Sequence, residues 1–167
     1  MTRPVAVAGG AGRAPYAEPM HTLLAILHVV GAVFIVGPMA ILPQSGLRAI
    51  RAREPGAVST IARSTFIFTL ASVVVAVIGF GVVGTTDKSK YNLSISTPWV
   101  LISLIVWVVA VALSLFAVVP ALRSAAEHLQ SPDTDHVNSN DYKRIAMTSG
   151  VVSLLLLVVV VLMVWKP

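Results

Sequence analysis

The stretch that decides the fold runs from residue 98 to residue 122 and reads PWVLISLIVWVVAVALSLFAVVPAL. It contains no Asp, Glu, Lys or Arg. About 18 uncharged, mostly apolar residues are enough for a helix to cross a hydrocarbon core roughly 30 Å thick. This run extends back to residue 91, and three more uncharged apolar runs cover residues 22–47, 64–86 and 145–165. The sequence therefore predicts an all-α protein, a bundle of four transmembrane helices.

The composition agrees with a membrane protein. Of the 167 residues, 56% are hydrophobic and 11% are charged, and the mean hydropathy is +0.87. A soluble domain carries about a quarter charged residues. The net charge of +5 does not indicate nucleic acid as a partner, because the basic residues lie just outside the spans, where they set topology. The absence of cysteine excludes disulfides, thiolate catalysis and Cys-ligated metal centres.

We divide the chain into an N-terminal tail, residues 1–19, and a transmembrane domain, residues 20–167. Within the domain, the spans are expected at about 20–47, 60–86, 97–122 and 142–165. The tail is rich in Ala, Gly and Pro, which is typical of an extended, flexible segment. It is not expected to be a signal peptide, because the first apolar run is longer than a signal-peptide core and continues through Pro43 towards Arg48.

The basic residues predict the orientation. The connections between spans one and two and between spans three and four carry Arg48, Arg51, Arg53, Arg63, Arg123, Lys143 and Arg144. Cytoplasmic loops are enriched in Lys and Arg. We therefore expect a multi-pass protein of a bacterial plasma membrane with both termini outside.

Two helices are expected to project beyond the membrane. The third should run from Pro98, which is well placed at a first helical position, to about Leu129. The first should continue to Arg53, where residues 54–56, Glu-Pro-Gly, break it. For the fourth, Asn140 and Asp141 are candidate N-caps.

A weak internal similarity links the two halves of the chain. The pattern Pro43, Leu47, Arg48 resembles Pro120, Leu122, Arg123. Two helical hairpins related by an axis along the membrane normal would produce such matches. The bundle is therefore interpreted as two similar hairpins, with chance as the alternative.

His28 is the candidate for redox chemistry within the uncharged runs. A membrane histidine can ligate haem iron. His21 precedes it by two turns, about 10 Å along the helix, which is too far for one metal ion to bind both. A packed, hydrogen-bonded histidine explains His28 more simply, and no second intramembrane histidine completes a bis-histidine site. We therefore predict no cofactor and no metal, and keep His28 as a haem candidate.

Two further patterns in the spans indicate helix packing. Gly79, Gly81 and Gly84 spell G-x-G-x-x-G, but inside a membrane helix this motif predicts close helix approach and not nucleotide binding. Trp107 lies in mid-span, where its indole N–H needs a partner. It is predicted to face another helix, in this chain or in a partner subunit, and is our candidate for a partner interface.

Polar residues between the spans suggest one binding function. Arg48, Arg51, Arg53 and Arg63 are candidates for binding anionic phospholipid head groups, although topology alone also accounts for them. The segment from Ser131 to His136 is interpreted as a solvated turn, since it lacks the ligand pattern of a calcium loop.

The residues from His21 to Arg48 also carry a resemblance. The stretch LHVVGAVFIVGP, residues 27–38, followed by Pro43 and Arg48, resembles the first span of small four-helix bacterial membrane proteins, some of them linked with copper resistance or haem synthesis. The whole chain, rich in Ala, Val and Arg, resembles actinobacterial members of the respiratory supercomplex association factors. That resemblance implies an accessory subunit bound to cytochrome bcc and cytochrome oxidase components.

Three classes of function follow from the sequence. The first is a non-catalytic accessory or scaffold subunit of a respiratory electron-transfer supercomplex, with other membrane subunits and anionic phospholipids as partners. The second is a haem-linked or quinone-linked redox protein that uses His28. The third, a small transporter, is disfavoured because ion coupling generally needs a buried carboxylate, which the spans lack. We expect the first, and hence no enzyme.

Overall fold

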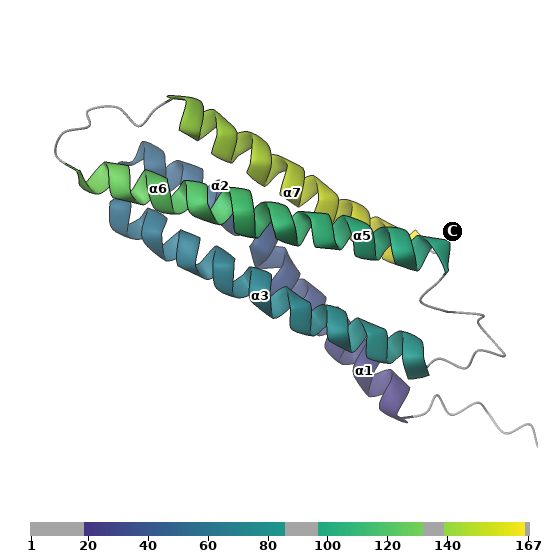
Figure 1. Ribbon diagram of the computed structural model, residues 1–167. Coiled ribbons are helices and arrows are strands. Elements are labelled where there is room, and N and C mark those ends of the chain that lie inside the picture. The colour runs from purple at the N-terminus through teal and green to yellow at the C-terminus, as the bar shows by residue number, and fades with distance from the viewer. Residues whose placement is uncertain (1–18, 86–96, 132–138, 166–167) are drawn as a thin grey trace, which may run out of the picture.

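Four long apolar helices make up the computed structural model (Figure 1). It describes residues 19–85, 97–131 and 139–165, and all statements below concern these residues. Candidate membrane spans cover Met20–Arg51, Pro55–Gly84, Pro98–Gln130 and Tyr142–Trp165, and these parts of the chain contain no strand. The predicted all-α, four-span fold is confirmed. Residues of the predicted tail up to 18, and residues 132–138 of the predicted solvated turn, lie outside the described ranges.

The first and third spans are each built from three consecutive helical segments. In the first they are α1 (Pro19–Gly31), η1 (Ala32–Val36) and α2 (Gly37–Arg51). In the third they are α5 (Pro98–Leu113), η2 (Ser114–Val118) and α6 (Val119–Gln130). The second and fourth spans are the single helices α3 (Pro55–Thr85) and α7 (Ser139–Trp165).

Each interrupted span contains a wide π-helical turn just before a proline. The Gly37 amide donates to Ala32 O in η1, and the Val119 amide donates to Ser114 O in η2. Pro38 and Pro120 follow directly, and a proline lacks the N–H that a regular helix would use. The two π-turns therefore give the first and third spans the same build. By this local feature Pro120 corresponds to Pro38, whereas the sequence similarity compared it with Pro43.

Several helix ends differ from the predicted ones. The first span ends at Arg51, and Pro55 and Gly56 do not break it but begin α3. In the turn between them Arg53 has a φ of 54°, and the Glu54 and Arg53 amides donate to Ala49 O and Ile50 O. This is the pattern of a Schellman cap.

Two other ends bear on the predictions. The helix α7 begins at Ser139, so Asn140 and Asp141 lie in its first turn and do not precede it. The third span ends at Gln130, close to the predicted Leu129.

The helices pack as two pairs that join at one end of the bundle. We call this the arginine end; there α2 and α6 terminate and α3 and α7 begin. At the opposite, termini end, α1 packs on α3 and α5 packs on α7. Contacts between α3 and α6 and between α2 and α7 join the pairs. In Figure 1 the pairs separate towards the termini end.

The core follows this arrangement. Its fully buried side chains come largely from the segments that meet near the arginine end, and include Met39, Val58, Leu122 and Ile145. No buried side-chain nitrogen or oxygen in the described ranges lacks a hydrogen bond. Hydroxyls such as Thr69 and Ser114 donate to carbonyls of their own helix, which satisfies them in an apolar medium. Ser153 Oγ of α7 lies 2.7 Å from Ala40 O of α2 and 3.0 Å from Ser149 O of its own helix, and the shorter contact links the two pairs.

Candidate functional site

His28 lies on the face of α1 that packs against α3. Its Nδ1 is 2.9 Å from the backbone oxygen of Val75, and the side chain is partly buried. A carbonyl oxygen can only accept, so Nδ1 carries the proton and donates. In the neutral ring the lone pair is then on Nε2, and the hydrogen bond fixes the ring's orientation.

Gly79 provides the space for this ring. A Cβ built on Gly79 would lie 2.7 Å from His28 Cε1 and 3.0 Å from Nδ1, closer than real atoms approach. The same interface places Gly31 against Val75 and Gly81 against Leu24. Close packing at Gly79 and Gly81, predicted from the sequence, is thus confirmed. Gly84 faces open space and does not take part.

The His28 position supplies one imidazole as a possible ligand. Within the described ranges no group of three or more His, Cys, Asp or Glu side chains could hold a metal ion. The hydrogen bond from Nδ1 to a backbone carbonyl is the arrangement that orients metal-binding histidines through Nε2. If the protein bound haem, His28 could supply one nitrogen ligand through Nε2, and any further protein ligand would have to come from another side chain.

Trp107 faces other helices of its own chain, and its role at a partner interface stays a prediction. Its side chain is partly buried and packs against the core cluster of the bundle. The aromatic side chains most exposed in mid-span are Phe34 and Phe116, at 70% and 81%. They lie in η1 and η2, at matching positions in the two π-turns. The sequence analysis did not single out Phe34. Its exposure depends on the π-helical turn before Pro38, and the sequence analysis did not predict that turn.

The four arginines predicted to bind head groups do not form one cluster. Arg51 lies over the ring of Tyr142 on α7, with Cζ 4.9 Å from the centroid. Arg53 occupies the turn before α3, and Arg48 is exposed on α2. Arg63 instead lines a groove between α3 and α6 together with Arg123.

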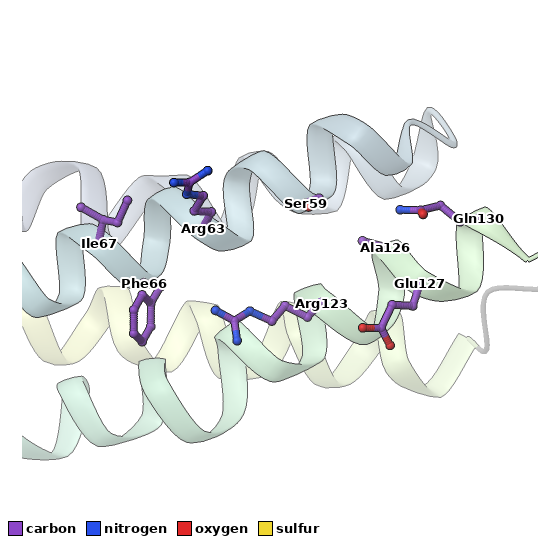
Figure 2. Close-up of a pocket in the computed structure, with 8 residues that line it drawn as sticks. All are labelled: Ser59, Arg63, Phe66, Ile67, Arg123, Ala126, Glu127 and Gln130. Atoms are coloured by element: carbon purple, nitrogen blue, oxygen red, sulfur yellow. The ribbon is translucent and has the colours of Figure 1, made fainter.

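The groove has a volume of about 680 Å³ and lies at the arginine end (Figure 2). It is lined from α3 by Ser59, Arg63, Phe66 and Ile67, and from α6 by Arg123, Ala126, Glu127 and Gln130. Residues three and four apart share a helix face, so each set is one stripe. The sequence analysis missed Arg123 as a binding residue, although the spacing of these stripes was visible. What it did not indicate was that the two stripes face each other.

These features define a multi-pass integral membrane protein with four helices, one histidine-bearing interface and one basic groove. Residues 22–167 match the model of the family described as predicted integral membrane protein (DUF2269), and the chain belongs to that family. No curated protein and no solved structure matches the chain.

Proposed function

We propose that the protein is a non-catalytic accessory subunit that binds other membrane subunits of a respiratory electron-transfer assembly and stabilises contacts between them. The observation that carries this proposal is the sparse packing of the first span. Only 6% of its most apolar window is buried in the protein, compared with 28% in the third and fourth spans. The first span therefore offers the largest apolar area to a neighbouring helix.

The exposed side of the first span has a continuous stripe of side chains. Within the protein α1 packs on α3 through the face that carries Leu24 and His28. The opposite face exposes Leu23, Ile26, Leu27, Val30, Val33 and Phe34. Their spacing of three and four residues presents them on one side of the helix. Helices associate in membranes through such packing surfaces. The resemblance noted above supplies the class of partner, the cytochrome bcc and cytochrome oxidase subunits.

Photocrosslinking in the native membrane tests the proposal. A photoreactive residue is placed at Ile26, Val30 or Phe34, and as matched controls at Leu157 and Val161, which are exposed on α7. We expect crosslinks to cytochrome-containing subunits from the first set and few from the second. Purification in mild detergent should then recover those subunits with the protein. Equal crosslinking from both sets, or recovery without cytochromes, would refute the accessory-subunit proposal.

A second candidate function is favoured by the His28 geometry. The Nδ1 donor bond to Val75 O leaves Nε2 as the free nitrogen of a neutral, oriented ring, which is what an axial haem ligand requires. An absorption spectrum of the gently purified protein tests it. A haem protein should show a Soret band that the His28→Ala variant loses, whereas a wild-type spectrum without that band excludes haem binding.

A further inference from the structure

We propose that the groove between α3 and α6 binds the head group of an anionic phospholipid, with the first part of an acyl chain along Phe66 and Ile67. This proposal rests on the groove alone and is independent of the subunit role above. Two observations lead to it: the order of polar and apolar residues along the groove, and the net positive charge of the side chains that line it.

Polarity changes along the length of the groove. Ser59 and Gln130 lie towards the arginine end, where α3 begins and α6 terminates. Phe66 and Ile67 lie further along α3, inside the uncharged run that begins at residue 64. The arginines are placed between these two parts. A phospholipid has the same order: a polar head group, then the phosphate, and then, beyond the glycerol esters, the hydrocarbon of the acyl chains. A soluble anion would make no use of the apolar part.

The charge of the groove favours an anion. Arg63 and Arg123 are exposed, and among the described residues Glu127 is the only acidic side chain that lines the groove. The formal charge of the groove is therefore positive. Arginine binds phosphate oxygens through its planar fork of donors, and basic side chains next to a membrane attract anionic lipids.

Arg123 is held in position by an aromatic contact. Its Cζ lies 5.5 Å from the centroid of the Phe66 ring, within the range of a cation–π interaction. In Figure 2 the Arg123 side chain reaches from α6 towards Phe66, while the guanidinium of Arg63, which also lines the groove, points away from α6 in this view. The guanidinium of Arg123 is thus placed where the apolar part of the groove begins. We place the phosphate of the proposed lipid at this point.

Lipid retention measured by native mass spectrometry tests the site. Purified full-length protein is incubated with phosphatidylglycerol, with phosphatidylcholine, or with inorganic phosphate. We expect selective retention of phosphatidylglycerol, and about thirtyfold weaker retention by R63Q/R123Q, which corresponds to about 2 kcal/mol for two basic side chains. The matched control R144Q removes an exposed arginine of α7 that does not line the groove. Equal loss in R144Q and R63Q/R123Q would overturn the proposal, as would retention of phosphate alone at the level of the lipid.

A second variant keeps the test independent of folding. Because Glu127 places a negative charge in the groove, E127Q should strengthen retention of phosphatidylglycerol several-fold, an increase that misfolding cannot produce. A third, I67W, tests the acyl chain. Its fluorescence above the wild-type background should be quenched more by phosphatidylglycerol brominated on the chains than by equally brominated phosphatidylcholine. Unchanged retention in E127Q, or equal quenching in I67W, would contradict the proposed site.

Discussion

His28 on α1 donates a hydrogen bond from Nδ1 to the backbone oxygen of Val75 on α3, at 2.9 Å. It is a side-chain hydrogen bond from the first span to the second span, at an interface where Gly31 also lies against Val75. The residue that looked most like a redox group therefore also has a packing role. Both uses rely on the same geometry, since the bond to Val75 fixes the ring.

Replacing His28 by Phe tests the packing role. Phenylalanine has a similar size but no donor, so the variant should lose about 1 kcal/mol, the range measured for hydrogen bonds between membrane helices. A titration with a denaturing detergent would measure this loss in the free energy of unfolding. Val33→Ala is the control: Val33 is exposed in η1, so the substitution should change that free energy little. A His28→Phe variant as stable as wild type would show that the bond contributes nothing net.

Gly79→Ala should be destabilising because the added methyl group meets the His28 ring at 2.7 Å. The ring cannot turn away without breaking its bond to Val75, so we expect a loss of about 1–3 kcal/mol, as for other overpacked sites. Gly84→Ala on the same helix is the matched control, since nothing lies within 4 Å of its added Cβ.

The pair also allows a double-mutant cycle. If the clash with the ring is the cause, His28→Ala should relieve much of the cost of Gly79→Ala, giving a coupling of about 0.5–3 kcal/mol. Additive losses in the double variant would place the strain elsewhere.

The spans could be predicted from the sequence because their cause is local. A chain in hydrocarbon must satisfy its backbone hydrogen bonds internally, so an uncharged run such as residues 98–122 is sufficient evidence for a helix. Pro120 within that run did not end the helix, since the π-turn at Ser114–Val118 accommodates it. The composition of the run gave no sign of that turn.

The candidate sites were harder to predict because they depend on how helices are rotated against each other. Arg51 and Arg63 are close in sequence, yet one lies on Tyr142 of α7 and the other lines the groove with α6. Likewise, Gly79 was expected to pack closely, but the sequence did not indicate that the side chain it packs against is His28. Spacing along one helix gives a face, and only the packed pair shows what that face meets.

Ser153→Ala should weaken the junction between the two helix pairs. Ser153 Oγ lies 2.7 Å from Ala40 O on α2 and accepts from Gln44 Nε2 at 3.2 Å. Losing this link should cost about 1 kcal/mol. The control is Thr148→Ala on the same helix, whose hydroxyl donates within α7, to Arg144 O at 2.7 Å. If the two variants lose equal stability in the detergent titration, the bond between α2 and α7 contributes no more to the free energy of unfolding than a bond within one helix.

Arg51→Gln should remove the cation–π contact with Tyr142, in which Cζ lies 4.9 Å from the ring centroid. Since Arg51 is exposed, the expected loss is about 0.5–1 kcal/mol. Arg48→Gln is the control. It removes an equal charge from an exposed position of the same helix, and among the described residues Arg48 lies over no aromatic ring. Tyr142→Leu keeps an apolar side chain against α2 but removes the aromatic face, so Arg51→Gln should cost little more in that background. A full additional loss there would mean that Arg51 stabilises the arginine end through its charge and not through the ring.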